Sequence, residues 1–480
     1  MKRSSVGLRA GSVIVSKDKK EYRMEHDSVG DKKVPAEAYY GVQTLRAAEN
    51  FPITGLNIHP ELISSVAYIK KAAAIANSKS GRLDEKKAEA IVSACDEILD
   101  GKLLNDFIVD PIQGGAGTSL NMNANEVIAN RAIELLGGNK GTYSIVHPND
   151  DVNMGQSTND VIPTAGKMTT TRLLLNLKVQ MQCLQIALSK KAKEFEKVIK
   201  MGRTQMQDAV PISLGQEFQA YCDAIKRNVS RMDKAIEEMR TVNIGGTAIG
   251  TGINADQDYI ANIVPILNDV SGMDLYQAHD LIDSTQNLDP FVTVSGIVKA
   301  CAVSLSKIAN DFRLMSSGPR AGLGEIILPA KQNGSSIMPG KVNPVIPEVV
   351  NQVAFNVIGN DMTITLAAEA GQLELNAFEP IIFYNLFQSI DTLGFAVETF
   401  VDNCVTGVVA NEKRCREFVE RSVGIITVLV PIVGYQRAAD IAKRALAQDK
   451  SVLEIVVAEN IMKEEEAKTI FNPEKMIKFE

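Results

Sequence analysis

Apolar residues recur at intervals of three and four positions over three long stretches of the chain, and this periodicity limits the fold more than any other feature. The repeating residues are Leu174, Leu177, Met181, Leu184, Leu188, Ala192, Phe195 and Ile199, then Phe218, Cys222, Ile225, Val229, Met232, Ile236 and Met239, and finally Val294, Ile297, Cys301, Leu305, Ile308 and Phe312. This spacing places apolar side chains on one face of an α-helix, and each stretch is long enough for a helix of roughly 30 Å. Such faces are buried when long helices pack nearly parallel. We therefore predict a mainly α fold centred on a bundle of long helices.

The regions on either side of these stretches are less regular and predict two smaller parts. A shorter helix is expected over residues 83–98, with Asp84 as its N-cap and Gly101 as its C-terminal stop. Charge rises after residue 410, and short helical segments follow. Helices longer than one domain also tend to find partners in other chains. The predicted parts are a mixed, mostly helical domain at 1–158, a helical bundle at 159–413 and a small helical domain at 414–480.

Charge and hydropathy exclude several classes of partner. The 51 lysines and arginines and 58 aspartates and glutamates are interspersed and give a net charge of −7, which favours neither nucleic acid nor an anionic membrane. The longest charge-free apolar stretch, Ser422–Gln436, is interrupted by Pro431 and is shorter than the ~20 residues of a membrane-spanning helix. We therefore expect a soluble protein without nucleic-acid or membrane partners.

Histidine and cysteine are scarce, which argues against metal, thiol and imidazole chemistry. The chain has four histidines and six cysteines, none in an H-E-x-x-H or C-x-x-C motif. We expect no metal and no disulfide, with the cysteines as small buried apolar residues of a cytoplasmic protein. Residues 1–17 are basic, rich in serine and free of acids. They resemble an organelle transit peptide, although a disordered extension or an over-long start is the favoured interpretation.

Four polar segments interrupt the apolar pattern, and together they form the candidate site. They are Gly114–Ser119, Gly155–Asp160, Gly202–Gln205 and Gly334–Pro344. Taken singly, the first three are typical of helix caps, and Thr118 is a candidate for such a role. The fourth is not a phosphate-binding loop, because five residues separate Gly334 from Gly340 and Val342 replaces the required serine or threonine. Its Lys341 and Asn343 precede a helix start, an arrangement that suits a small carboxylate substrate.

The fourth segment, GSSIMPGKVNP, closely resembles the signature loop of the fumarase/aspartase superfamily. The other three segments resemble the remaining active-site regions of that superfamily, in the same order and at similar separations. The resemblance covers nearly all of residues 21–470. It implies a long-helix bundle shared in a homotetramer, active sites that each take residues from three chains, and no cofactor.

Details of the motifs resemble the aspartase branch more than the fumarases. Gly114–Ser119 and Gln156–Asn159 match aspartases, and Gln205 stands where fumarases carry histidine. Some aspartases also keep that histidine, and family members that have it tend to pair it with a glutamate. Glu374 is the candidate for that glutamate, but opposite Gln205 its role is open. A class II fumarase and a catalytically silent scaffold remain the alternatives.

The resemblance also implies a reaction and a role for each site residue. The reaction is the reversible deamination of L-aspartate to fumarate and ammonia, through an enediolate formed when the C3 proton is removed. Ser335 is the implied base, activated by backbone donors of its loop and by Lys341. The implied binding residues are Thr118, Ser157, Thr158 and Ser336 for the β-carboxylate, Lys341 and Asn343 for the α-carboxylate, and Asn159, Thr204 and Gln205 for the amino group, with Thr204 also able to share the α-carboxylate.

Overall fold

The computed structural model describes residues 21–477, which are mainly helical and form two compact units. The first unit holds the described residues up to Gln156 together with Ala255–Ser271. The second holds Ser157–Asn254 and the chain from Gly272 onward. The mainly α fold class is therefore confirmed, whereas the predicted three-part division stays a prediction. The basic segment at residues 1–17 lies outside the described residues.

Short helices and one hairpin build the first unit. Strands β1 (Tyr22–Asp27) and β2 (Gly30–Pro35) pair antiparallel. The helices are α1 (Val42–Asn50), α2 (Pro60–Lys79), α3 (Glu85–Leu99), α4 (Thr118–Leu135) and α7 (Gln257–Ser271), with α2 packed on α3 and α7. As predicted, Asp84 caps α3 by accepting the N–H groups of Lys86 and Lys87, and the helix stops just before Gly101.

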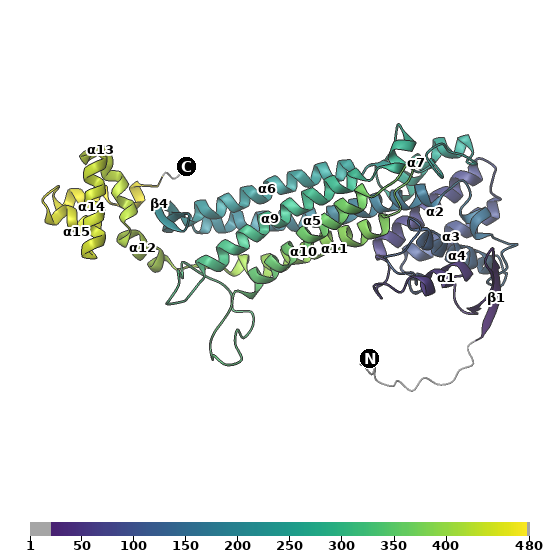
Figure 1. The fold of residues 1–480 in the computed structure, drawn as a ribbon, viewed down its shortest axis with the longest axis horizontal. Coiled ribbons are helices and arrows are strands. Elements are labelled where there is room, and N and C mark those ends of the chain that lie inside the picture. Colours follow the sequence, from purple (N-terminus) through teal and green to yellow (C-terminus); the bar gives the residue numbers. More distant parts are fainter. Residues whose placement is uncertain (1–20, 478–480) are drawn as a thin grey trace, which may run out of the picture. The chain divides into compact units, whose positions relative to one another are not determined.

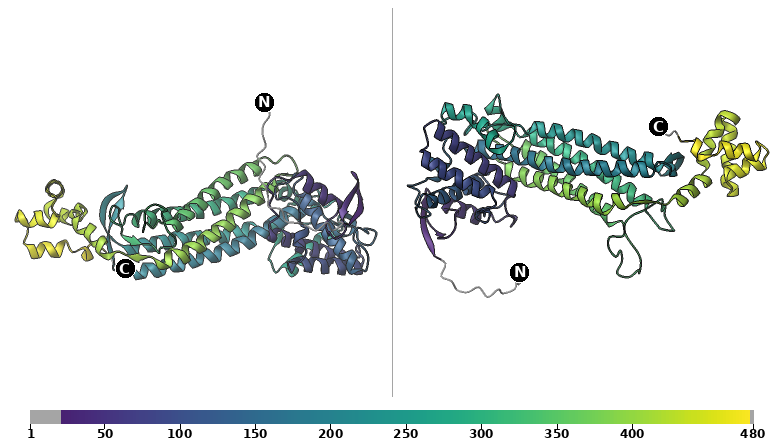
Figure 2. Two further views of the ribbon diagram at one scale, coloured as in Figure 1. Left: turned by 90° about the horizontal axis from the view of Figure 1, so that it is seen from below. Right: turned by 180° about the vertical axis from the view of Figure 1, so that it is seen from behind.

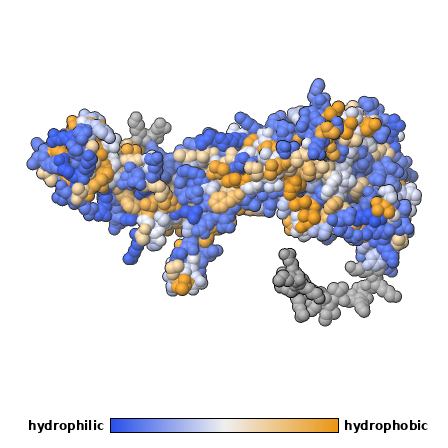
Figure 3. Space-filling view, viewed as in Figure 1, coloured by the Kyte–Doolittle hydropathy of each residue, from blue (hydrophilic) through white to orange (hydrophobic). Residues whose placement is uncertain are grey.

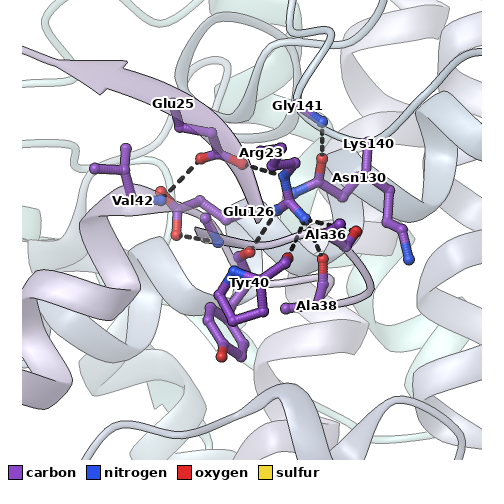
Figure 4. Close-up of polar contacts among 12 residues, drawn as sticks. Arg23, Glu25, Ala36, Ala38, Tyr40, Val42, Glu126, Asn130, Lys140 and Gly141 are labelled. Carbon is purple, nitrogen blue, oxygen red and sulfur yellow. Dashed lines mark hydrogen bonds and ion pairs between the residues drawn. The ribbon is translucent and has the colours of Figure 1, made fainter. Parts of the chain in front are cut away.

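Two buried carboxylates hold the start of α1 in this unit (Figure 4). Glu126 of α4 accepts the backbone N–H groups of Gly41, Gln43 and Thr44. Glu25 of β1 accepts the N–H of Val42. Burial raises the pKa of Glu126, although these donors act in the opposite direction. The orphan N–H groups of α1 are thus satisfied by side chains from distant elements, which fixes α1 against α4.

Five long helices form the bundle of the second unit (Figure 1). They are α5 (Thr158–Glu194), α6 (Leu214–Glu238), α9 (Asp289–Met315), α10 (Val345–Glu369) and α11 (Glu379–Asn403). Helix α5 packs on α6 and α11, and α10 packs on α9 and α11. The two further views show the long helices of the bundle side by side (Figure 2). The three predicted apolar stripes lie on α5, α6 and α9. Most of their side chains are buried, as expected for a bundle core.

A hairpin, and not a continued helix, joins α5 to α6. Strands β3 (Ile199–Thr204) and β4 (Gln207–Ser213) pair antiparallel, and Ile199 lies opposite Ser213. The expectation that Ile199 extends the helical stripe was therefore wrong. Helix α5 ends at Glu194, and Ile199 instead packs against the apolar cluster of the carboxyl-terminal helices.

Short helices follow the bundle, as the sequence predicted. They are α12 (Glu412–Arg421), α13 (Val430–Val433), α14 (Tyr435–Gln448), α15 (Val452–Ala458) and α16 (Glu464–Ile470). Their apolar side chains share one cluster with Met201 of β3. The remaining elements are η1 (Leu104–Asp106), η2 (Pro148–Val152), β5 (Thr241–Val242), β6 (Tyr276–Gln277), α8 (Leu281–Gln286), β7 (Ile326–Ile327), η3 (Val405–Gly407), β8 (Val409–Ala410), η4 (Val423–Leu429) and η5 (Pro473–Lys475).

All six cysteines are free, and five are buried, but Cys183 is exposed. The expectation of burial was wrong there because Met181 and Leu184 take the inward face of α5, so Cys183, which lies between them in the sequence, points outward. By length and composition alone, α9 could cross a membrane. Here one face of α9 is buried against its neighbours in the bundle.

Candidate active site

The first polar segment turns the chain into α4 through three left-handed residues. Gly115, Ala116 and Gly117 have φ angles of 78°, 53° and 83°. Gly117 is the N-cap of α4, so the alternative that Thr118 caps the helix is wrong. Thr118 is the first helical residue, and its hydroxyl donates to the carbonyl of Gly115 at 2.6 Å. Binding a carboxylate requires this hydroxyl to exchange the carbonyl for the ligand.

The second segment starts α5 and is held from both sides. Ser157 caps the helix and accepts the N–H of Asn159 at 3.2 Å, which leaves the serine proton for another acceptor. Asp160 is fully buried and accepts the N–H groups of Gly245 and Thr247. Asn159 donates its side-chain amide to the carbonyl of Ala248 at 2.7 Å. The loop after β5 therefore fixes the helix start, whose N-terminus attracts anions.

The third segment forms the tip of the β3–β4 hairpin. Thr204 pairs with Gln207, so Gln205 and Met206 are the two turn residues, with φ angles of 53° and 65°. Two successive positive φ angles are typical of a type I′ turn, which favours asparagine and glycine. Residues 204–206 are exposed. A glutamine in this conformation is uncommon, and such outliers are often functional.

The fourth segment is a loop whose two ends are joined by hydrogen bonds, and we call these joined ends its neck. The N–H of Gly334 donates to the carbonyl of Lys341 at 2.9 Å, and the Asn343 side chain donates to the carbonyl of Gly334 at 2.6 Å. A Cβ atom at position 334 would lie 2.5 Å from the Lys341 oxygen, so only glycine fits there. Asn343 thus closes the loop with one of its two amide protons. The other can still reach a ligand.

Ser335 lies inside this neck, where backbone donors meet its hydroxyl. Its Oγ accepts the N–H of Ile337 at 3.2 Å and the N–H of Met338 at 2.9 Å. Donors aimed at an oxygen stabilise the charge that develops when its proton leaves. The side chains of Ser336 and Lys341 are exposed on the same loop. The Ser335 oxygen is therefore held by two backbone donors of its own loop.

One chain cannot bring these segments of the second unit into one site. Ser157, Thr158 and Asn159 start α5, whereas Thr204 and Gln205 follow its far end, and 37 helical residues between them span about 55 Å. Similarly, α10 separates the Ser335 loop from Glu374, which lies in the turn between α10 and α11. Glu374 therefore lies at the opposite end of the bundle from Gln205 of the same chain.

Sequence reasoning missed the buried carboxylate of Glu325, which contacts Arg203 beside Thr204. The available signal was one acid within the apolar run Leu323–Ile327. No group of three histidine, cysteine, aspartate or glutamate side chains able to hold a metal occurs within residues 21–477. His59 and His147 serve as helix caps there.

Known proteins share this sequence and fold over nearly its full length. Residues 30–359 match the lyase family, and residues 425–478 match the fumarase C C-terminus family. An aspartate ammonia-lyase of Bacillus subtilis (strain 168) is 54% identical, covering 96% of this chain and 97% of that protein. Another, of Helicobacter pylori (strain J99), is 54% identical over 95% of this chain and 98% of that protein.

Solved structures agree. The structure described as a fumarate lyase:delta crystallin from Brucella melitensis bound to cobalt is 51% identical, with a TM-score of 0.93, and the match covers 95% of this chain and 99% of that one. A class II fumarase from Schistosoma mansoni is 36% identical, with a TM-score of 0.92 and the same coverage. The resemblance found in the polar segments is thereby confirmed, and the chain belongs to the fumarate lyase family.

Proposed function

We propose that this protein is an aspartate ammonia-lyase, which converts L-aspartate reversibly to fumarate and ammonia. The observation that carries the proposal is the pair of backbone N–H groups donated to Ser335 Oγ. A serine hydroxyl is ordinarily too weak an acid to lose its proton near neutral pH, and these donors favour the alkoxide that removes the C3 proton. The curated relatives, 54% identical and named for this reaction, support the choice of substrate.

Stabilising the enediolate is the main catalytic task. Loss of the C3 proton places a second negative charge on the β-carboxylate, so hydrogen-bond donors there act more strongly in the transition state than on the substrate. Thr118, Ser157, Thr158 and Ser336 supply hydroxyl donors for this carboxylate. The Ser157 proton is the best prepared of these, because its oxygen already accepts the N–H of Asn159.

The remaining residues hold the other end of the substrate. Lys341 pairs with the α-carboxylate, and Asn343 adds its second amide proton. Asn159, Thr204 and Gln205 surround the amino group that leaves as ammonia, with Thr204 able to share the α-carboxylate. Gln205 offers a neutral amide, so it orients the amino group and does not exchange protons with it.

The active sites are composite, and the working protein is a homotetramer in which each site takes residues from three chains. The length of α5 supports this proposal, since it separates two site segments of one chain. A stripe of exposed apolar residues on α10, at helical spacing, also supports it: Phe355, Ile358, Met362 and Leu366. Apolar side chains are visible along the bundle in Figure 3.

We also propose a cytoplasmic location for the protein. The six free cysteines support this location.

The test is an ultraviolet assay of fumarate formation, run once with L-aspartate and once with L-malate as the substrate. We expect turnover of aspartate and not of malate. Ser335→Ala should retain fold and assembly and lower kcat at least about a hundredfold, whereas Ser93→Ala, on the exposed face of α3, should match the wild type. Turnover of malate alone indicates a fumarase, and near-normal turnover by Ser335→Ala refutes the role of the base.

A further inference from the structure

Glu325 is a fully buried carboxylate that contacts the β3–β4 hairpin and precedes the Ser335 loop in the chain. Its side chain is inaccessible to solvent, which is costly for a charge unless cations lie close by. Two cations do. Arg203 Nη1 donates to Glu325 Oε1 at 2.8 Å, and Lys200 Nζ lies 3.1 Å from Oε2. Both cations belong to β3, the strand that leads to the proposed site residues Thr204 and Gln205.

Both cations also contact side chains other than Glu325, so the carboxylate belongs to a larger cluster. Lys200 Nζ also donates to Glu217 of α6 at 2.9 Å. Burial alone would lower the pKa of Lys200, but Glu217 and Glu325 outweigh it and raise that pKa, which keeps the ammonium charged. The Arg203 guanidinium lies over the ring of Phe418, at 5.3 Å from its centroid.

The backbone of Glu325 is anchored as firmly as its side chain. Its N–H donates to the carbonyl of Met315, the last residue of α9, at 2.8 Å. Its carbonyl accepts the N–H of Asn411, the N-cap of α12, at 2.9 Å. Directly after it, β7 pairs with β8, and the chain then continues into the Ser335 loop. Glu325 is therefore anchored through both of its backbone groups shortly before the chain enters that loop.

We propose that Glu325 is a positioning residue that fixes the β3–β4 hairpin, with Thr204 and Gln205, to the base of the Ser335 loop. The inference rests on the proposed function for its kinetic consequence. The carboxylate binds β3, and the backbone of the same residue leads towards the Ser335 loop, so loss of the carboxylate removes the link between the hairpin and the base of the loop. Thr204 and Gln205 face the leaving amino group, so kcat is expected to fall more than KM rises.

The first test removes the charge and keeps the shape. Glu325→Gln should lower kcat for aspartate between about tenfold and a hundredfold. Arg203→Lys should also lower kcat. The double variant should cost less than the product of the two single effects, since both remove one interaction. Unchanged kinetics in a folded Glu325→Gln protein overturn the proposal. Should that variant fail to fold, unchanged kinetics in Arg203→Lys overturn it equally.

A second measurement does not depend on activity. Lys331, just before the Ser335 loop (Gly334–Pro344), and Lys341, within it, are exposed, so trypsin cleavage of the native protein reports how firmly the base of the loop is held. Glu325→Gln should be cut faster there than the wild type, and equal cleavage rates contradict the proposal. If the wild type does not deaminate aspartate, the proposed function fails, while this cleavage test still decides the role of Glu325.

Asp361→Asn is the matched control. Asp361 of α10 is also a buried carboxylate, paired with Lys299 and bonded to Ser295 of α9. Its substitution should lower the melting temperature without changing kcat, KM or cleavage of the Ser335 loop. A control that reproduces the kinetic loss of Glu325→Gln would show a general effect of destabilisation and overturn the positioning role.

Discussion

Gln205 occupies a backbone conformation that few residues with side chains adopt, and its neighbour Met206 does the same. Glycine adopts positive φ freely, so glycine at either position relieves strain in the turn. Glycine substitutions at the two positions therefore separate the effect of the turn backbone on stability from the effect of the Gln205 amide on activity.

Gln205→Gly should keep or raise the melting temperature and lower kcat about three- to tenfold, the worth of one neutral hydrogen bond. Met206→Gly is the control, because its side chain is exposed and has no proposed role. It should raise stability similarly and leave kcat unchanged. Full turnover by Gln205→Gly, measured as fumarate release, would remove Gln205 from the site.

At the scale of residues, the family resemblance implied Ser335 as the base, but the sequence did not predict what surrounds this serine. Ser335, Lys341 and Asn343 stand out in one segment, whereas the closed neck depends on the Asn343 amide reaching Gly334 nine residues away in the sequence. Glu325 escaped notice because its partners Arg203 and Lys200 lie over a hundred residues earlier. Pairings of that range leave no local periodicity.

Helices α5 and α11 pack closely around a buried acid. A Cβ atom on Gly166 of α5 would lie 2.1 Å from the Phe383 ring of α11, so only glycine permits this approach. Glu379, the first residue of α11, is fully buried, and both its carboxyl oxygens lack a hydrogen-bond partner. Burial raises the pKa of Glu379 well above its usual value, although Lys167 opposes this. Burial likewise lowers the pKa of Lys167 to about 8, against the effect of nearby acids.

A raised pKa of Glu379 makes the stability of this packing depend on pH. Above about pH 4.5 the unfolded chain releases the proton that the folded chain retains, so the stabilising contribution is lost as pH rises. Glu379→Gln removes that loss. Its melting temperature should exceed that of the wild type by more at about pH 8 than at about pH 5. Glu398→Gln, exposed on the same helix, should show no such trend, and a constant difference for Glu379→Gln would contradict the expectation.

Elements with one buried face were predictable, and those fixed by long-range pairing were not. The stripes on α5, α6 and α9 and the capped start of α3 followed from spacing and from Asp84 alone. Ile199 was misplaced because an apolar residue fits a strand as well as a helix when the neighbouring element is unknown. The left-handed turns at Gly115–Gly117 and Gln205 depend on what surrounds them, which spacing does not encode.

At the scale of the whole molecule, the proposed composite sites predict that two inactive chains can restore activity together. Ser157→Ala and Ser335→Ala alter segments at opposite ends of the bundle, and each is expected to be inactive alone. Co-expressed in equal amounts, they should give about a quarter of the wild-type activity, because random assembly leaves that share of sites with both residues intact. The control is a mixture of separately assembled proteins, and hybrids as inactive as that mixture would show that each site belongs to one chain.

The length of α5 finally bears on when a newly made chain becomes an enzyme. A spacer of about 55 Å keeps two halves of the chemistry apart in every single chain, however well that chain folds. With the proposed composite sites, a newly made chain is inactive and gains activity only when it associates with other copies. The specific activity of a dilute solution should therefore depend on protein concentration. Dilution would lower not only the number of chains but also the fraction of them that is assembled and active.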